Sequence, residues 1–259
     1  MPSEKSALVL MHGILMSGSC WQDVVPLLSD HHEVFTPTAL GHYGGPPVLR
    51  RPTTSGDLVD AAEHYLDQQG LERPHLVGLS LGGWMAIELA RRGRAESVCA
   101  LAPAGFWSAG DRAQSHARKE VRKFVAMGRL ASPVRPIVAF AMKSAIVRKI
   151  GFRTAACHPD RISAALGAQL LDGIIGATIN VDDLLASDEQ IAPLDPLPCP
   201  ITIAWSANDA VVQLSPNDRV ARQRVPQASF TVLPGVGHVP FFDDPDLVAR
   251  TILASTCVA

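Results

Sequence analysis

The sequence predicts an α/β fold with a mostly parallel sheet of about six strands flanked by helices, and three observations carry this prediction. Short apolar runs alternate with segments of helical spacing, which is the order typical of βαβ units. A chain of 259 residues fits a single domain of this class. Hydrophobic residues make up 47% of the chain and charged residues 19%, so the composition is that of a globular protein and excludes disorder.

The first part of the chain contains four of the expected strands and three helices. Apolar runs predict strands at 7–11, 33–36, 75–79 and 97–101. Helical patterns are expected at 21–28, 55–69 and 81–92. In the second of these helices, Leu58, Ala62 and Tyr65 share one face, and Gly70 provides the stop.

The alternation breaks after residue 105. The block 106–195 is helical in pattern, basic in its first part and without a clear strand. Regular alternation then resumes, with strands expected at 201–205 and 229–233 and helices at 218–224 and 246–254. The sequence therefore predicts one sheet domain, formed by 1–105 and 196–259, with a helical cap inserted at 106–195.

Charge and targeting signals narrow the class of protein. The formal net charge of −2 argues against a nucleic-acid-binding protein. No apolar run approaches the roughly 18 residues of a membrane span, so no integral span is expected. The apolar run near the N-terminus has only five residues, 7–11, which is too short for a signal peptide. A cytoplasmic location is therefore expected, while the oligomeric state stays open.

The cysteines do not indicate a disulfide framework or a metal site. The five cysteines are odd in number and contain no Cys-x-x-Cys pair, which favours reduced thiols in a cytosolic protein. The nine histidines are scattered along the chain. Neither a metal nor an organic cofactor is expected, and the partner implied is a small-molecule substrate.

A candidate nucleophile lies in the run Gly78-Leu79-Ser80-Leu81-Gly82-Gly83. The run falls between an expected strand and an expected helix, where a sharp turn exposes the serine hydroxyl and the glycines accommodate the strained backbone. A tight turn in which the serine only caps the following helix would show the same sequence pattern. The strand–turn–helix context favours Ser80 as a nucleophile.

A serine nucleophile needs a base that takes its proton and an acid that orients this base. His238 lies in a glycine-rich loop just after the last expected strand, and Asp209 follows directly on the strand 201–205. Asp243 and Asp244 compete with Asp209 for the acid, but their position favours the start of the last helix. Where a serine nucleophile lies at a strand–turn–helix elbow, the acid and then the histidine follow it along the chain. Ser80, Asp209 and His238 have this order.

The oxyanion hole of such a site needs two backbone N–H donors. Leu81, the residue after the nucleophile, supplies one of them in this arrangement. The second is expected from the loop after the first strand, where Gly13 permits a close turn and Ile14 is the candidate donor.

These pieces together resemble the α/β-hydrolase superfamily over nearly the whole chain. The residues that carry the resemblance are His12-Gly13, Gly78-x-Ser80-x-Gly82-Gly83, Asp209 and Gly237-His238. The resemblance implies an α/β-hydrolase fold with a helical cap, and a Ser-His-Asp triad. Only eleven residues precede His12, where family members often have an additional hairpin, so a compact sheet like that of the plant esterases and hydroxynitrile lyases is expected.

The same resemblance separates hydrolysis from related chemistries. The cyanide-releasing lyases place a lysine beside the catalytic histidine and a thiol after the nucleophile, whereas this chain has Val239 and Leu81. Haloalkane dehalogenases and epoxide hydrolases use an aspartate nucleophile, and Ser80 argues against both. Carbon–carbon bond hydrolases of aromatic catabolism share the triad and use an arginine of the cap to hold a substrate carboxylate.

The expected cap is rich in basic residues. Between Arg112 and Arg161 there are twelve Lys or Arg and two acidic residues. A solvated helical face explains such a run, and binding of an anionic acyl group or a membrane surface is the alternative. The candidate substrate-binding residues are Gly13, Phe106, Trp107, Phe140 and Val239.

The sequence therefore predicts a serine hydrolase that cleaves carboxylic esters of small or medium substrates through an acyl-enzyme. Two alternatives stay open: a carbon–carbon bond hydrolase or enol-lactonase, and a ligand-binding receptor on a hydrolase scaffold. Fold-level analogy does not specify the substrate.

Overall fold

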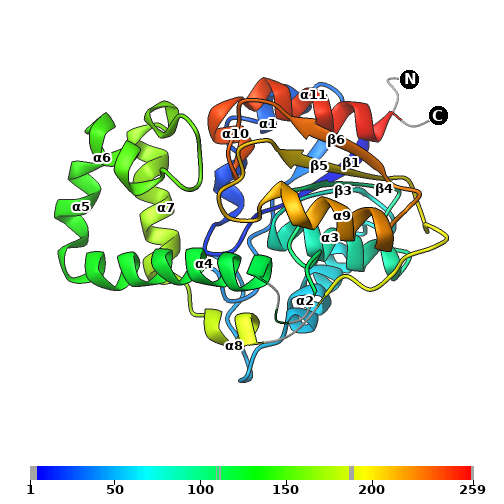
Figure 1. Ribbon diagram of the computed structural model, residues 1–259, viewed down its shortest axis with the longest axis horizontal. Helices are drawn as coiled ribbons and strands as arrows, with labels where there is room; N and C mark the ends of the chain where they lie inside the picture. Colours follow the sequence, from blue (N-terminus) through cyan, green and yellow to red (C-terminus); the bar gives the residue numbers. More distant parts are fainter. Residues whose placement is uncertain (1–4, 109, 111, 187–189, 258–259) are drawn as a thin grey trace.

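A six-stranded, fully parallel sheet forms the centre of the protein (Figure 1). The computed structural model describes residues 5–108, 110, 112–186 and 190–257. The strand order is β2-β1-β3-β4-β5-β6. The strands are β1 (Ser6–Met11), β2 (His32–Phe35), β3 (His75–Leu79), β4 (Ser97–Leu101), β5 (Ile201–Ser206) and β6 (Ser229–Leu233). The predicted fold class is confirmed, because each expected strand is present within one or two residues of its predicted bounds.

Helices cover both faces of the sheet (Figure 1). One layer contains α2 (Ser55–Gln68), α3 (Leu81–Arg91) and α9 (Leu214–Arg224), and the other contains α1 (Val25–Leu28), α10 (Pro240–Asp243) and α11 (Pro245–Thr256). Alternate residues of a strand enter opposite layers, as the pleat requires. Val9 and Met11 of β1 pack with the first layer, whereas Leu8 and Leu10 pack with the second.

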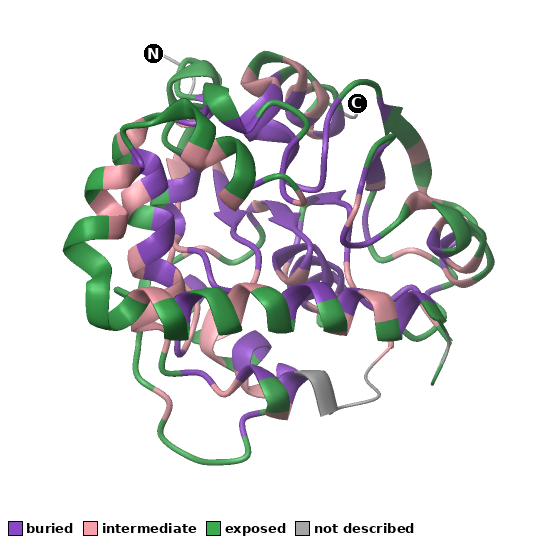
Figure 2. Ribbon diagram, turned by 60° about the vertical axis from the view of Figure 1, so that its left-hand side comes forward, coloured by how far each residue is buried: buried purple, intermediate pink, exposed green. Residues whose placement is uncertain are grey.

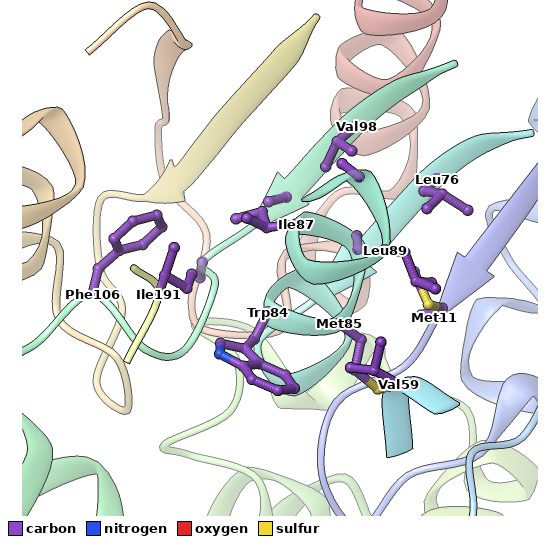
Figure 3. Packing of buried hydrophobic residues seen from close by; sticks show 14 of the residues in the cluster. Met11, Val59, Leu76, Trp84, Met85, Ile87, Leu89, Val98, Phe106 and Ile191 are labelled. Atoms are coloured by element: carbon purple, nitrogen blue, oxygen red, sulfur yellow. The ribbon is translucent and has the colours of Figure 1, made fainter. Parts of the chain in front are cut away.

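The packing of α3 explains why the turn before it is held rigidly. Trp84, Met85, Ile87 and Leu89 of this helix belong to one buried cluster with residues of the strands, among them Leu76 and Val98 (Figure 3). Each large apolar side chain buried in this way contributes about 1.5–3 kcal/mol to stability. The N-terminus of α3 is therefore fixed with respect to the ends of β1 and β3.

The helices of the 106–195 block all lie between β4 and β5 in chain order and stand to one side of the sheet (Figure 1). We refer to them as the cap. They are α4 (Arg112–Ala131), the 3-10 turn η2 (Ser132–Val134), α5 (Arg135–Ala141), α6 (Ala145–Gly151), the 3-10 turn η3 (Pro159–Arg161), α7 (Ala164–Gly176) and α8 (Val181–Ala186). Figure 2 shows that the outer helices of the cap are largely exposed, whereas buried residues of α7 face inward.

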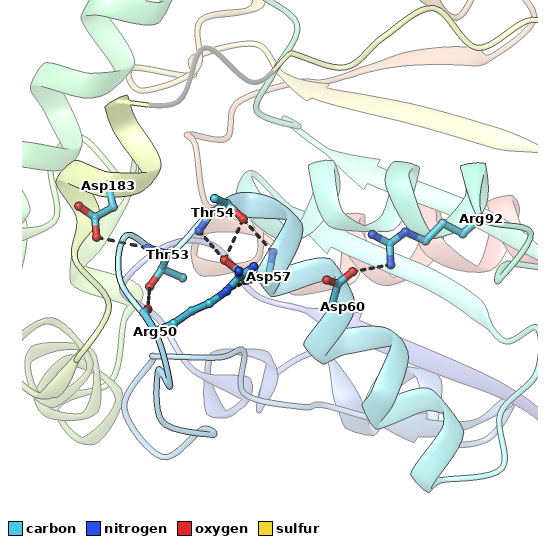
Figure 4. Close-up of polar contacts among 7 residues, drawn as sticks. All are labelled: Arg50, Thr53, Thr54, Asp57, Asp60, Arg92 and Asp183. Carbon is cyan, nitrogen blue, oxygen red and sulfur yellow. Dashed lines mark hydrogen bonds and ion pairs between the residues drawn. The ribbon is translucent and has the colours of Figure 1, made fainter.

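Polar contacts at the start of α2 connect the sheet domain with the cap (Figure 4). The Thr54 hydroxyl accepts from Asp57 N at 3.2 Å while Thr54 N donates to the Asp57 carboxylate at 2.8 Å, which forms a capping box. The hydrogen bond from Thr54 N, followed by that from Arg50, lowers the pKa of Asp57. The neighbouring Thr53 N donates to Asp183 of α8 at 3.4 Å.

The structure differs from the sequence prediction at three helices: α9 begins at Leu214 and not near residue 218, the short α10 is not among the expected helices, and the first helix is divided. A single helix was expected at 21–28, but the chain forms the 3-10 turn η1 (Gly18–Trp21) and then the short α1. Pro26 lies in the first turn of α1 and carries no backbone N–H. It therefore cannot donate the hydrogen bond that would continue a helix from the preceding residues.

Candidate active site

Ser80 occupies a strained turn between β3 and α3. Its backbone has φ 53° and ψ −110°, a combination that an L-residue adopts only under constraint from its surroundings. The constraint comes from close packing at the flanking glycines. A Cβ at Gly78 would lie 2.1 Å from Gly82 O, and one at Gly82 would lie 2.3 Å from Met11 O. The turn therefore requires glycine at both positions, as a nucleophile elbow does.

The strand order places this turn beside the loop after β1. The chain pairs β1 with β2 on one side and with β3 on the other, and Met11 lies opposite Gly78. This point, where the strand order reverses, is where open parallel sheets bind ligands. Ser80 at the end of β3 and the His12-Gly13-Ile14 loop at the end of β1 consequently meet at the same edge.

His238 and Asp209 are paired in the structure. His238 Nδ1 lies 2.8 Å from Asp209 Oδ2, and both side chains are buried. The other oxygen of Asp209 accepts the backbone N–H groups of Val211 and Val212, each at 2.8 Å. With Nδ1–H donating to a carboxylate held in this way, Nε2 of the neutral imidazole carries the lone pair that can accept a proton.

Two cavities meet at Ser80. The first has a volume of about 80 Å³ and contains both Ser80 and His238 in its wall; its other lining residues are almost all apolar and include Met16, Phe124, Phe152, Leu170, Ile174 and Phe242. The second has a volume of about 90 Å³ and is lined in addition by Leu81, Trp84, Trp107, Gln114 and Arg118. Ile14, Val121 and Val211 line both cavities.

The two expected oxyanion donors lie at this junction. Ile14 and Leu81 both line the second cavity beside Ser80. Among the described residues, neither of their backbone N–H groups has a hydrogen-bond partner, so both can donate to a bound oxygen. The backbone of Ser80 is itself held, because Ser80 N donates to Leu101 O at 2.9 Å and Ala104 N donates to Ser80 O at 3.1 Å.

His12 anchors the loop that carries Ile14. Its Nε2 accepts the backbone N–H of Ala39 at 2.9 Å, so Nδ1 carries the proton and donates to Gly13 O at 2.8 Å. Burial, followed by the nearby His42, lowers the pKa of His12 to about 3. The His12 ring is therefore neutral at physiological pH, and it locks the turn at Gly13.

Asp243 has a role that the sequence reasoning missed. Its carboxylate accepts backbone N–H groups from Gly237 at 2.8 Å, Cys157 at 3.0 Å and His158 at 2.6 Å. The prediction that Asp243 and Asp244 both start the last helix is corrected accordingly. Asp244 does so, accepting from Leu247 N at 2.8 Å. Asp243 instead joins the histidine loop to the cap, and no local pattern marks partners more than eighty residues away.

The five candidate substrate-binding residues do not all lie at the cavities beside Ser80. Gly13 and Val239 line the first cavity and Trp107 lines the second. Phe106 is fully buried against Trp205, and Phe140 is 69% exposed on α5. Neither of these lines a cavity at Ser80, so the expectation for Phe106 and Phe140 is corrected: the first is a core residue and the second belongs to the outer surface of the cap.

The described residues contain no group of three His, Cys, Asp or Glu side chains positioned to hold a metal ion. All five cysteines are free thiols. Burial raises the pKa of Cys99 to about 12 and that of Cys199 to about 11, so both thiols stay protonated and unreactive at neutral pH.

A strained serine at a strand–helix turn and a buried His–Asp pair on one cavity define a hydrolase-type site. The model of the alpha/beta hydrolase family matches residues 8–251, and the chain belongs to this family. It is 32% identical over 206 residues to the epoxide hydrolase EphH of Mycobacterium tuberculosis, covering 77% of this chain and 93% of the relative. The chain is thus a hydrolase, and the resemblance seen in its sequence is confirmed.

Esterases are also among the similar proteins. The chain is 29% identical over 263 residues to the pimeloyl-[acyl-carrier protein] methyl ester esterase of Aromatoleum aromaticum, which covers 92% of this chain and 93% of that protein. The solved structure of a thermophilic esterase from Thermogutta terrifontis superposes with a TM-score of 0.68 at 23% identity, covering 97% of this chain and 89% of the other. This likeness supports the fold.

Proposed function

We propose that this protein is a carboxylic-ester hydrolase that works through Ser80, His238 and Asp209. The observation that carries the proposal is that Ser80 and His238 share one cavity while Asp209 holds His238 Nδ1 at 2.8 Å. A serine hydroxyl is a weak nucleophile at neutral pH and needs such a base. The family membership and the esterase relatives support the same reaction class.

The proposed mechanism uses these three side chains and two backbone N–H groups. His238 Nε2 takes the proton of the Ser80 hydroxyl as its oxygen attacks the ester carbonyl, and the N–H groups of Ile14 and Leu81 receive the resulting oxyanion. The tetrahedral intermediate expels the alcohol, which takes the proton from His238. A water molecule then attacks the acyl-enzyme, gives its proton to His238 and releases the acid, while Ser80 regains its proton.

The cavity walls support esters with apolar groups of small or medium size. The first cavity is lined by Ser80 and His238 together with apolar side chains from α4, from α7 and from the segment that precedes η1. An apolar acyl or alkyl group gains about 0.8 kcal/mol for each methylene buried there. We assign the first cavity to the apolar side of the ester and the second, which includes Gln114 and Arg118, to its more polar side.

The relative named as an epoxide hydrolase makes epoxide opening a second candidate. Attack of a serine oxygen on an epoxide carbon would produce an ether, which water does not readily cleave, whereas a carboxylate nucleophile produces a hydrolysable ester. Ser80 therefore favours acyl transfer. A styrene oxide assay tests this choice, because sustained turnover of the epoxide by the intact protein would contradict it.

A carbon–carbon hydrolase or an enol-lactonase has one observation in its favour. Arg118 of the cap helix α4 lines the second cavity, where a cation can hold a substrate carboxylate. Comparing kcat/KM for a simple p-nitrophenyl ester, an enol-lactone and a vinylogous diketone distinguishes these reactions. A preference for the diketone would replace ester hydrolysis as the assignment.

The nucleophile itself is tested with Ser80→Ala. The variant is expected to lose turnover of p-nitrophenyl butyrate and labelling by a fluorophosphonate probe while keeping its circular-dichroism spectrum. Retained burst kinetics would contradict Ser80 as the nucleophile. Labelling of the intact protein without any ester turnover would instead favour the ligand-binding receptor.

A further inference from the structure

Large apolar side chains project into solvent from one region of the cap. Eleven large hydrophobic residues of the described chain are exposed, and seven of them fall between residues 127 and 150. We call these seven the cap patch: Met127, Leu130, Val134, Ile137, Phe140, Ile146 and Ile150, with exposures from 42% to 78%. Single exposed apolar residues are ordinary, whereas a cluster marks an interaction surface.

The cap patch is formed by consecutive short elements at the edge of the molecule. Its residues lie on the last turns of α4, on η2, on α5 and on α6. Helices α5 and α6 lie on the side of the cap away from the sheet (Figure 1). Within these elements the residues recur at helical spacing, as Ile137 and Phe140 do on α5, so they share a face. None of the seven lines either cavity at Ser80.

Positive charges lie in the same stretch of chain as the cap patch, and only some of them are paired with acidic residues. Between Glu120 and Asp160 the chain has eight basic residues and no acidic residue, although the whole chain has a net charge of −2. Arg129, Lys143 and Arg153 are exposed and make no ion pair with any described residue. Lys143 Nζ lies 4.7 Å from the centroid of the Phe140 ring, so cationic and apolar groups lie side by side.

We propose that the cap patch docks this protein on the surface of an anionic lipid bilayer. Bulky apolar side chains can enter the boundary between headgroups and acyl chains while the surrounding Lys and Arg contact the anionic headgroups. A second copy of the chain fits poorly, because a symmetric interface brings each patch against its own counterpart and so opposes like charges. The seven side chains are exposed and none of them lines a described cavity, which fits a fluid surface better than a folded partner.

The same helices indicate attachment to a bilayer and not a span through it. By length and composition alone, the helical stretch Arg112–Ala141 could cross a membrane, and almost none of its apolar window is buried. However, η2 with Pro133 interrupts this stretch between α4 and α5. The first half of α4 is also packed on the protein through Ala113, Ala117 and Val121. The segment is therefore held along the protein surface.

Docking would place the substrate cavity next to the lipid. Helix α4 carries Met127 and Leu130 of the cap patch, and its Val121 and Phe124 line the first cavity. If the proposed ester hydrolysis is correct, apolar esters dissolved in the bilayer are the substrates that this arrangement serves. The docking itself is independent of the reaction and can be measured without any substrate.

The experiment measures partition of the intact protein onto vesicles by co-sedimentation. Vesicles of phosphatidylcholine with about 30% phosphatidylglycerol are compared with pure phosphatidylcholine at about 0.1 M salt. We expect binding to the anionic vesicles only. Lys143→Gln combined with Arg153→Gln is expected to weaken it about 25-fold, since each basic residue contributes roughly fivefold. Ile137→Ser combined with Phe140→Ser is expected to weaken it by about tenfold or more.

Matched controls lie on the sheet domain. Leu49 is 90% exposed and Val232 is 48% exposed, so Leu49→Ser with Val232→Ser removes equivalent apolar groups away from the cap patch. Arg219→Gln with Arg250→Gln removes two exposed charges of α9 and α11. These controls are expected to bind like the native protein. All variants should retain the native circular-dichroism spectrum and the native activity on a soluble ester.

Three results would overturn the proposal. The first is absence of binding to either vesicle, which includes the case of an acidic protein partner. The second is binding that the control pairs weaken as much as the cap patch pairs. The third is a dimer in analytical ultracentrifugation that the cap patch variants dissociate, because this would identify a second copy of the chain as the occupant.

Discussion

The Asp243 carboxylate accepts the backbone N–H of Gly237 at 2.8 Å, and Gly237 immediately precedes His238. The same carboxylate accepts N–H groups of Cys157 and His158 from the cap. A single buried side chain thus connects the loop that carries His238 to the cap segment whose Phe152 and Ala155 line the first cavity. The position of His238 therefore depends on the cap as well as on Asp209.

Replacing Asp243 by asparagine is expected to lower kcat more than it raises KM. The amide keeps the shape of the carboxylate, but its N–H₂ group replaces one acceptor oxygen and faces backbone N–H groups. The free energy of unfolding is expected to fall by about 1–3 kcal/mol as a result. We expect kcat to fall by about tenfold as the histidine loop loosens. The measurements are kcat, KM and chemical denaturation.

The matched control for Asp243 is Asp244→Asn. Asp244 is the N-cap of α11, and asparagine caps a helix as well as aspartate does. This variant is expected to keep native kcat and nearly native stability. Equal effects of the two substitutions would contradict a positioning role for Asp243.

Asp209→Asn is expected to reduce kcat by about 10³–10⁴ while the protein remains folded. An amide can present its N–H₂ group to His238 Nδ1, which then becomes the acceptor and leaves the proton on Nε2, the nitrogen that must act as base. The hydrogen bonds from Val211 and Val212 can persist to the remaining oxygen. Activity recovered at high pH in a hydroxide-dependent manner agrees with this cause, whereas native kcat at pH 7 excludes Asp209 as the acid.

Gly82→Ala is expected to destabilise the protein by about 1–3 kcal/mol or more and to abolish activity. The added Cβ would lie 2.3 Å from Met11 O, a backbone atom that cannot move without disturbing β1. Gly151→Ala provides the control, because no atom lies within 4 Å of its Cβ position. The control should be neutral or stabilise the protein by about 0.5–1 kcal/mol, as measured by thermal and urea denaturation.

Acid is expected to destabilise the fold through His12 and His42. Burial lowers the pKa of His42 to about 4, and the pKa of His12 is about 3. The unfolded chain binds these protons near pH 6.5 and the folded protein does not, so the free energy of unfolding decreases as the pH falls from about 6.5 toward 4. Each histidine contributes a slope of up to about 1.4 kcal/mol per pH unit.

The variant His42→Gln isolates one of these two contributions. It is expected to have a shallower decrease of stability between pH 6 and pH 4 than the native protein, in urea titrations at each pH, by up to about 1.4 kcal/mol per pH unit. The exposed His31→Gln serves as the control and should retain the native slope. An unchanged slope in His42→Gln would exclude this histidine as a source of the acid sensitivity.

The sequence by itself determined the strands, most of the helices and the position of the strained serine. These features depend on local rules: period-two and helical spacing of apolar residues, and glycines where the turn around Ser80 leaves no room for a Cβ. They could be read without any knowledge of distant contacts. The order of Ser80, Asp209 and His238 along the chain likewise needed no coordinates.

Only the tertiary structure decided which residues meet. Asp209 and not Asp243 reaches His238 Nδ1, and Phe106 is turned into the core while Phe140 is left in solvent. The cap patch is equally a product of packing, because the sequence shows apolar residues between 127 and 150 but not which of them lack neighbours. Each of these outcomes depends on contacts between segments far apart in the chain, and local spacing carries no information about such contacts. The serine turn was therefore predictable, whereas its surroundings were not.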